Sequence, residues 1–395
     1  MKKQEKPGEL KRRSFLKTMA ATGLAASVTP IAGAALTGGQ HPEQQPQIVT
    51  NGKDALKYPR NDSSLPGKYP GKVVHIHDEA SVNNDIFNAE VINKMIAEGM
   101  LALTGEKSLR RAWRQFVKPG EMIGLKLNPV AGKPLSTSHE VVRSVIGQLT
   151  DAGIRERHIV LWDRREFQLH ETGFTPEAYP GIKITGTEQK DKDGSYYDAD
   201  GKLYGEKMID TDWYYHANTE MKYDEYTLPF MINEGEYSYF SKIVTKDLQK
   251  IINIPILKNA GANVTLCLKN LAFGCISNTS RLHARLWNNT VAEVPAFPPV
   301  RDKVVLNIVD GIKGCYNGGP GANPQFFTYY KDILIGTDPV AVDRVGYDIV
   351  IKKRIEKGIQ KEDTGSGLVT LRMAKDMGLG EYEDDRLEVI KKELS

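Results

Sequence analysis

The sequence predicts an α/β fold with a mostly parallel sheet, flanking helices and one hairpin insertion. Strand-like runs of Val, Ile and Leu alternate with segments whose apolar residues recur at helical spacing. Over residues 121–163, a strand, a capped helix and a second strand follow one another within about forty residues, as in a βαβ unit. Because parallel strands need such a crossover connection, the pattern predicts a parallel sheet.

The first elements are expected between residues 71 and 163. Predicted strands cover 71–78 ("GKVVHIHD"), 121–130 and 157–163, and predicted helices cover 88–105 and 136–153. The second helix begins with the pattern Thr137-x-x-Glu140, which is typical of a capping box, and ends at Gly153.

Residues 186–240 interrupt this alternation and are rich in Tyr and Asp. The piece "YYDADGKLY" predicts a hairpin around Asp-Gly, because its acidic spacing does not fit a calcium-binding EF-hand loop. The alternation resumes with a strand in "KDLQKIINIPIL", a buried strand over 302–312 and a helix that begins near Asp338. We therefore expect a single α/β domain over 71–395, with an insertion at about 186–240.

The N-terminus is typical of an export signal. "KRRSFLK" precedes a weakly apolar segment that is rich in Ala and Gly, contains Pro30 and ends in small residues. The pair Arg12-Arg13 resembles that of a twin-arginine signal. We expect a signal over 1–35, a polar linker over 36–70, passage through the twin-arginine translocation machinery, and a periplasmic or otherwise extracytoplasmic protein. A membrane anchor is the alternative, but Pro30 and the weak hydrophobicity argue against a stable span after cleavage.

The charge balance gives no sign of a nucleic-acid partner. The formal net charge is +3, and residues 1–35 contribute seven basic and two acidic side chains, so the remainder is near −2. A nucleic-acid binder would need a basic surface, which this composition does not provide. A small molecule is the expected ligand.

Three lysines follow apolar segments and have few acidic neighbours in the sequence. Lys126 follows "MIGL", Lys258 follows "INIPIL" and Lys269 follows "NVTLCL", and residues 248–292 contain no acid. A buried ammonium needs a partner or a ligand, or else its pKa shifts. Ligands of open α/β sheets bind beyond the carboxyl ends of the strands. The lysines therefore predict a cationic pocket for a carboxylate, a phosphate or a developing enolate.

Other polar residues complete the predicted site. Ligand binding is expected of Asn128, Asn270 and Asp343, and catalysis of His139, His283, Asp163 and Asp310. Either histidine would move protons, and Asp163 and Asp310 would orient it. The alternative is that the three aspartates pair with the lysines in an internal network that holds loops and binds no substrate.

The sequence leaves metals and cofactors open. Cys267, Cys275 and Cys315 have no C-x-x-C spacing, so a simple zinc or iron–sulfur cage is not expected, although one disulfide could form. His139 and His283 with a carboxylate could bind a metal, but only "HIH" has a spacing that metal ligands use. The sequence contains no G-x-S-x-G motif and no dinucleotide fingerprint after the first strand.

Several segments resemble the domain-of-unknown-function family 362. "KIINIPILKNAGANVTLCLKNLAFG", "RLHARLW", "NIVDGI" and "ILIGTDPVAVDRVGYD" occur in the order found in that family, and the likeness covers most of residues 71–350. The resemblance implies an α/β domain, which in some relatives belongs to iron–sulfur proteins. Here Asn259-Ala260 stand where the family often has a His, and the ferredoxin-like cysteine run is absent, so an iron–sulfur cluster is not expected.

Three functions are compatible with these residues. The leading hypothesis is an exported enzyme that acts on a small anionic or polyoxygenated molecule. The second is a non-catalytic exported binding or maturation factor that uses the same pocket. The third is a metal- or cofactor-assisted isomerase or racemase. It is suggested by a fainter similarity to the nickel-dependent lactate racemase family, limited to the order strand, polar loop, helix, Gly, strand and without that family's Gly-x-His signature.

Overall fold

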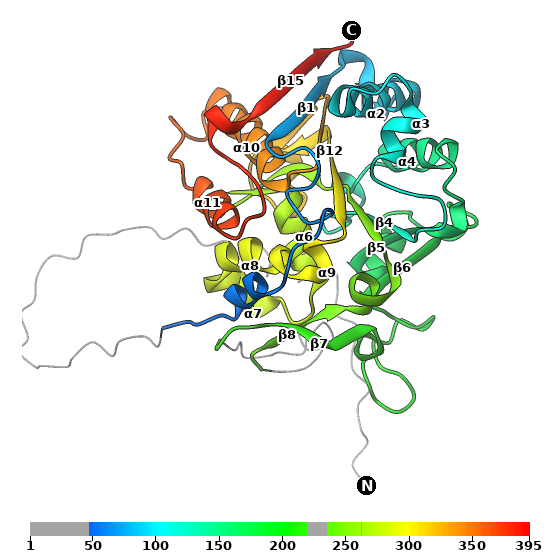
Figure 1. The fold of residues 1–395 in the computed structure, drawn as a ribbon, viewed down its shortest axis with the longest axis vertical. Helices are drawn as coiled ribbons and strands as arrows, with labels where there is room; N and C mark the ends of the chain where they lie inside the picture. Colours follow the sequence, from blue (N-terminus) through cyan, green and yellow to red (C-terminus); the bar gives the residue numbers. More distant parts are fainter. Residues whose placement is uncertain (1–46, 220–234, 262) are drawn as a thin grey trace, which may run out of the picture. The chain divides into compact units, whose positions relative to one another are not determined.

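A large mixed sheet with helices on both faces forms the centre of the protein (Figure 1). The structure is a computed structural model, and it describes residues 47–219, 235–261 and 263–395. Among these residues, Ile48–Ser395 belong to one compact unit. The α/β fold class predicted from the sequence is confirmed.

The sheet has 11 strands. They are β1 (Lys72–His77), β4 (Ile123–Lys126), β5 (Ile159–Arg165), β6 (Lys183–Glu188), β9 (Lys250–Asn253), β10 (Ile256–Ala260), β11 (Asn263–Thr265), β12 (Val304–Cys315), β13 (Phe327–Thr328), β14 (Asp332–Gly336) and β15 (Glu388–Glu393). The main path runs β15-β1-β14-β12-β9-β4-β5-β6, and β10 and β13 pair with β12. Strands β12, β9, β4, β5 and β6 are mutually parallel, whereas β14 is antiparallel to both of its neighbours.

Two short strand pairs lie outside this sheet. They are β2 (Val82–Asn83) with β3 (Ile86–Phe87), and β7 (Ile209–His216) with β8 (Tyr237–Ser241). The second pair lies within the insertion expected over 186–240. In the same insertion, Tyr197 and Leu203 form an antiparallel bridge, and Gly201 N donates to Asp198 O at 3.0 Å. The predicted hairpin around Asp-Gly is therefore confirmed.

The helices pack against the two faces of the sheet. They are α2 (Ala89–Thr104), α3 (Leu109–Arg114), α4 (His139–Asp151), α5 (Glu166–Glu171), α6 (Cys267–Cys275), α7 (Ser280–Arg285), α8 (Trp287–Glu293), α9 (Pro298–Arg301), α10 (Pro339–Glu356) and α11 (Leu368–Asp376). Leu161 of β5 packs in a core with α2, α3 and α4, whereas its neighbours Val160 and Trp162 pack in a second core with α6, α8 and α9. This alternation follows from the two-residue period of a strand.

Side-chain caps fix the starts of two main helices. The Asn88 side chain accepts from Val91 N at the start of α2, and the Asp338 carboxylate accepts from Val340 N and Ala341 N at the start of α10. Helix α2 ends at Gly105, whose φ of 69° is left-handed and suits glycine. The helix predicted to begin near Asp338 is confirmed.

The start of α4 differs from the capping-box prediction. Its N-cap is Ser138, whose side chain makes no capping hydrogen bond. The Thr137 hydroxyl donates to Ile254 O at 3.0 Å and accepts from Asn128 N at 2.9 Å. The prediction of Thr137 as the cap is wrong, because tertiary hydrogen bonds engage the hydroxyl that the motif would use.

Residues 48–70 pack onto the domain, in contrast to the linker expected over 36–70. Leu65 is fully buried, and its N–H donates to Arg301 O at 2.9 Å. The buried Arg301 side chain in turn donates to Pro59 O at 2.7 Å. The expected signal over 1–35 lies outside the described residues.

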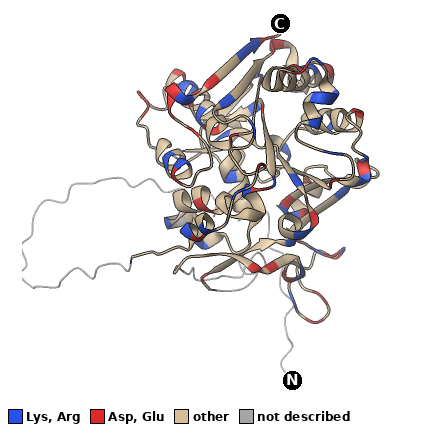
Figure 2. Cartoon of the chain, in the orientation of Figure 1, with Lys and Arg blue, Asp and Glu red and all other residues tan. Residues whose placement is uncertain are grey.

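Charged residues of both signs are interspersed over the described elements, as Figure 2 shows. This distribution agrees with the nearly balanced charge of the chain beyond residue 35. None of the helices in the described ranges combines the length and the apolar character that crossing a bilayer requires.

Candidate functional site

Lys126 is the last residue of β4, and its side chain is fully buried. Its ammonium forms an ion pair with Asp163 on the neighbouring strand β5 and donates to Leu127 O at 2.9 Å. A third contact is to Asn270 Oδ1 on α6, at 3.3 Å. The carboxylate compensates for burying the ammonium, as the internal-network alternative predicts. Lys126 thus orients Asn270.

Gly274 on α6 provides the space for this lysine. A β-carbon at Gly274 would collide with Cε of Lys126. Glycine inside a helix is otherwise unfavourable by about 1 kcal/mol relative to alanine. Gly274 was not among the sequence candidates, although a glycine within the apolar run "LAFGC" could have indicated it.

Four buried asparagines form a hydrogen-bonded chain from β4 to β12. Asn128 Nδ2 donates to Asn270 Oδ1 at 2.9 Å, and Asn270 Nδ2 donates to Asn253 Oδ1 at 2.8 Å. Asn253 Nδ2 donates to Asn307 Oδ1 at 3.0 Å. Asn253 and Asn307 were not among the sequence candidates. An amide directly after the apolar residues of "KIIN" and "VVLN" could have indicated them.

Lys258 lies within β10 and joins this chain by donating to Asn128 Oδ1 at 2.9 Å. Its side chain is fully buried, and the structure gives its ammonium no ion pair with a carboxylate of the described residues. Burial, and then the charge of Lys269, lower the pKa of Lys258 to about 7. A fraction of this side chain is therefore a neutral amine near physiological pH.

The sequence suggested that Lys269 follows a strand. In the structure it lies within α6, directly before Asn270. Every residue of α6 is buried, so the segment lacks the amphipathic period that identifies most helices. Lys269 is 9% exposed, and burial followed by the charge of Arg164 lowers its pKa to about 8. It also lies close enough to Lys258 to lower the pKa of that amine.

His283 on α7 lies beside Lys269. Its ring stacks on Phe273 with 4.1 Å between ring centres, and Nδ1 hydrogen-bonds to Thr279 O at 2.8 Å. The side chain is exposed, yet surrounding protein atoms, and then Lys269, lower the pKa of the imidazole to about 3. Because a carbonyl only accepts, Nδ1 carries the hydrogen and Nε2 is left as an acceptor.

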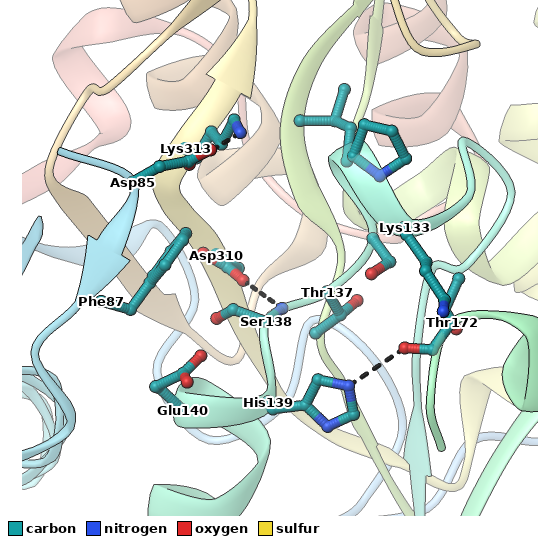
Figure 3. Close-up of a pocket in the computed structure, with 13 residues that line it drawn as sticks. Asp85, Phe87, Lys133, Thr137, Ser138, His139, Glu140, Thr172, Asp310 and Lys313 are labelled. Atoms are coloured by element: carbon teal, nitrogen blue, oxygen red, sulfur yellow. Dashed lines mark hydrogen bonds and ion pairs between the residues drawn. The ribbon is translucent and has the colours of Figure 1, made fainter. Parts of the chain in front are cut away.

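A cavity of about 280 Å³ lies beside β12 and the start of α4 (Figure 3). Two of the candidate residues, Asp310 and His139, line it. The Asp310 carboxylate accepts from Ser138 N at 2.7 Å and from Ile312 N at 3.2 Å. Burial raises the pKa of Asp310 to about 6, although hydrogen bonds from Ser138 act in the opposite direction. Asp310 can therefore exchange a proton near neutral pH.

Both ring nitrogens of His139 have partners inside the protein. Nε2 lies 3.0 Å from Thr172 O and Nδ1 lies 2.7 Å from the Tyr179 hydroxyl. Since Thr172 O only accepts, Nε2 carries the hydrogen and Nδ1 accepts from Tyr179. The ring also stacks on Phe174. Both nitrogens of His139 are thus engaged in the cavity wall, and its predicted role in proton transfer stays a prediction.

Asp343 does not join the lysines. Its carboxylate accepts from Cys267 N at 2.7 Å and from Leu268 N at 3.0 Å, in the first turn of α6. This contact satisfies backbone donors that a helix leaves without partners. Asp343 thus positions α6 and, through it, Lys269, and the ligand-binding role expected of it stays a prediction.

One loop connects the lysine–amide network to the cavity. Ile256 of β10 is the register partner of Asp310 on β12, and Lys258 lies two residues further along β10, beyond a shift in this register. The loop 127–138 contacts Lys258 at its start and Asp310 at its end. The structure therefore brings most of the predicted residues to one edge of the sheet, in two adjoining groups.

The described residues contain no group of three or more His, Cys, Asp or Glu side chains that could hold a metal ion. Cys267, Cys275 and Cys315 are buried free thiols, so the disulfide that the sequence allowed is absent. The two histidines of "HIH" both approach Asp332, at 3.0 Å from His75 and 2.8 Å from His77.

Comparisons with known proteins find a family match for one segment of the chain. No curated protein matches the sequence. A crystal structure of a Thermotoga maritima protein aligns with a TM-score of 0.36 and 8% identity, over 69% of this chain and 60% of that one. This chain therefore spans less than two thirds of that protein. Residues 223–348 match the family described as "Domain of unknown function (DUF362)", which confirms the predicted resemblance over this segment.

Proposed function

We propose that the protein is an enzyme that acts on a small anionic or polyoxygenated molecule at the edge of the sheet formed by the lysine–amide network and the adjoining cavity. The observation that carries the proposal is Lys258. A fully buried ammonium whose hydrogen-bond acceptor is an amide costs stability, and scaffolds avoid such groups. Groups of this kind, with perturbed pKa values, concentrate at functional sites.

The contacts of each residue suggest its role in substrate binding or proton transfer. Lys258 and Lys269 would bind or polarise oxygens of the substrate, and Asn128 and Asn270 would hold these oxygens in a fixed orientation. Asp310, whose pKa is about 6, would take or return the proton. Asp163 keeps Lys126 in place, so it is a positioning residue.

His283 has a different part in this proposal. Its Nε2 acceptor lies on an exposed ring beside Lys269, where it can hydrogen-bond a substrate hydroxyl. Its lowered pKa keeps it neutral, so it orients the substrate and does not add charge.

Replacing Lys269 by methionine tests the proposal. If Lys269 serves a ligand, Lys269→Met keeps or raises the stability of the protein while the ligand-induced thermal shift disappears. We expect this result in a thermal-shift screen of hydroxycarboxylates, phosphates and polyols against the wild type and the variant. Conversion of a bound compound, followed by NMR, then separates the enzyme from a binding or maturation factor.

The control is Lys183→Met, which removes an exposed ammonium that is 3.8 Å from Asp247. This control is expected to retain every thermal shift. A loss of several kcal/mol of stability in Lys269→Met would contradict the proposal. Such a loss is expected if the substitution leaves a buried acid without its partner, and it would show that Lys269 is a structural residue. A metal analysis of the protein purified after native export tests the isomerase alternative.

We also propose that the protein is exported through the twin-arginine pathway and acts in the periplasm or another extracytoplasmic space. The support is the sequence of residues 1–35, with its paired arginines, apolar segment and small residues.

Substitution of the paired arginines tests this route. The variant with Arg12→Lys and Arg13→Lys is expected to remain in the cytoplasm as the uncleaved precursor, whereas the wild type is recovered outside the cytoplasm at lower mass. Cell fractionation and mass spectrometry measure both. Equal export of the two proteins would contradict the twin-arginine assignment.

A further inference from the structure

Lys258 differs from Lys126, the other fully buried lysine of the network, in what surrounds its nitrogen. We propose that Lys258 is a nucleophilic amine that forms a covalent imine with a small carbonyl compound, and that this compound is a 2-oxo acid. The inference rests on the proposed function, because it names the substrate class and the type of reaction for the same site.

The hydrogen bonds of the two lysines suit different protonation states. Lys126 Nζ donates to three acceptors, which are the Asp163 carboxylate, Leu127 O and Asn270 Oδ1. An ammonium has three N–H donors, so Lys126 is fully satisfied as a cation. Lys258 Nζ has one acceptor among the described residues, Asn128 Oδ1 at 2.9 Å. An ammonium at Lys258 would keep two donors without acceptors, whereas a neutral amine has one donor fewer and a free lone pair.

The charges around Lys258 favour the same neutral form. Its register partner on β12 is Cys315, a buried free thiol whose pKa is raised by burial, so this neighbour carries no charge. The carboxylate that acts on Lys258, Asp163, is already paired with Lys126. Burial and then the charge of Lys269 lower the pKa of Lys258 to about 7. Proteins activate lysine nucleophiles in this way, by desolvation beside another cation.

Lys269 provides the charge that selects an acid as the carbonyl compound. It lies close enough to Lys258 to lower the pKa of that amine, and it is 9% exposed. Its ammonium lies 5.9 Å from the centre of the Phe273 ring, on which the exposed His283 ring stacks. The network therefore meets solvent on the Lys269 side. A carboxylate held there by Lys269 places the adjoining carbonyl carbon toward Lys258, as in a 2-oxo acid.

The reaction forms a carbon–nitrogen bond and releases water. The lone pair of Lys258 Nζ attacks the carbonyl carbon, and the π electrons of the carbonyl move to its oxygen. The nitrogen loses one proton and the oxygen gains one, which gives a carbinolamine. The hydroxyl then leaves as water together with the second proton of the nitrogen, and the C=N bond of the imine forms. The step consumes no oxidant and no reductant.

Reductive trapping with sodium cyanoborohydride on the full-length protein tests this inference. At about pH 7, we expect pyruvate or glyoxylate to add one reduced adduct per chain, and peptide mass spectrometry to place it on Lys258. Exposed lysines have pKa values of about 10.4 and are almost entirely protonated at this pH, so they react more slowly. The peptide map also separates this adduct from one on the α-amino group, whose pKa is about 8.

Lys126 is the internal control in the same digest. It is as fully buried as Lys258, but its ion pair with Asp163 holds it as an ammonium, so it is expected to stay unmodified. This comparison uses the wild type alone and does not depend on the folding of a variant.

Two variants complete the experiment. Lys258→Met is expected to lose the adduct completely and to remain folded, which a thermal unfolding curve verifies. Lys183→Met is the matched control, because it removes an exposed ammonium that is 3.8 Å from Asp247. This control is expected to form the adduct as the wild type does.

The outcomes separate this inference from the proposed function. An adduct on Lys258 that Lys258→Met loses and Lys183→Met keeps supports the inference. Absence of an adduct on Lys258, or equal modification of Lys126 and Lys258, overturns it. The proposed function still stands in that case if an anion of the screen gives a thermal shift that Lys269→Met abolishes. Absence of both the adduct and every thermal shift contradicts both.

Discussion

Asp163→Ala is expected to destabilise the protein by about 3–5 kcal/mol, which is the range for breaking a buried ion pair on one side. The substitution leaves the Lys126 ammonium fully buried, with only the Leu127 carbonyl and the Asn270 amide as acceptors. Two neutral acceptors do not replace a carboxylate in a medium that screens charge weakly. Urea denaturation at neutral pH measures the loss.

The double variant Lys126→Met with Asp163→Leu shows whether the uncompensated charge is the cause. Removing both charges is expected to restore most of the lost stability, because apolar residues of similar volume can replace a buried pair. The surface control is Glu388→Ala, which breaks an ion pair with Lys72 at 3.2 Å and should cost about 1 kcal/mol or less. If Asp163→Ala costs no more than this control, the buried ion pair with Lys126 does not stabilise the protein.

Lys258→Met is expected to stabilise the protein at about pH 6 and to destabilise it at about pH 10. The folded-state pKa of about 7 lies below the ordinary value of 10.5, and each pKa unit corresponds to about 1.4 kcal/mol. Below pH 7 the wild type therefore holds a buried ammonium at a cost of roughly 4–5 kcal/mol, which the variant avoids. The variant leaves the Asn128 carbonyl without its donor, which costs about 1–3 kcal/mol at any pH.

The sign of the pH dependence follows from proton binding. Between about pH 7 and 10.5 the unfolded chain holds a proton at Lys258 that the folded chain has lost, so the stability of the wild type rises with pH there. The advantage of Lys258→Met is thus about 2 kcal/mol at about pH 6 and reverses to a deficit of about 1–3 kcal/mol at about pH 10. Urea denaturation at the two pH values measures it. A difference between the variant and the wild type that does not change with pH would show that Lys258 is not desolvated.

The α/β architecture could be predicted because its local patterns agree with the final packing. The alternation of Leu161 with Val160 and Trp162 is a two-residue period, and Asp338 with Pro339 is a helix start that needs no tertiary information. Helix α6 was not predicted, because it is buried on all sides. Its sequence is a continuous apolar run without helical periodicity, and such a run also occurs in buried strands. The capping-box prediction at Thr137 failed because the hydroxyl hydrogen-bonds to Asn128 N and Ile254 O, which are distant in the sequence, and not to the helix.

The candidate site was predictable in its residue types but not in its grouping. Lys126, Lys258 and Asp163 were recognised because charges in apolar runs are costly and need an explanation. Which groups meet depends on strand order, and the sequence does not give the adjacency of β4 with β9, or of β10 with β12, in space. Asn253 and Asn307 escaped notice because a neutral amide in a strand is a weaker signal than a charge, although both link the network.

The pairing of β1 with β15 determines when this end of the sheet can be completed during folding. Residues 72–77 lie parallel to residues 388–393, and Leu394 N donates to His77 O at 3.1 Å. During synthesis, the first strand of the sheet must wait for this late segment to leave the ribosome before one of its edges is covered. Contacts so distant along the chain form slowly, because a very long loop has to be closed first. Until then, the nascent chain exposes an unpaired strand edge, which is the kind of surface that chaperones shield from aggregation.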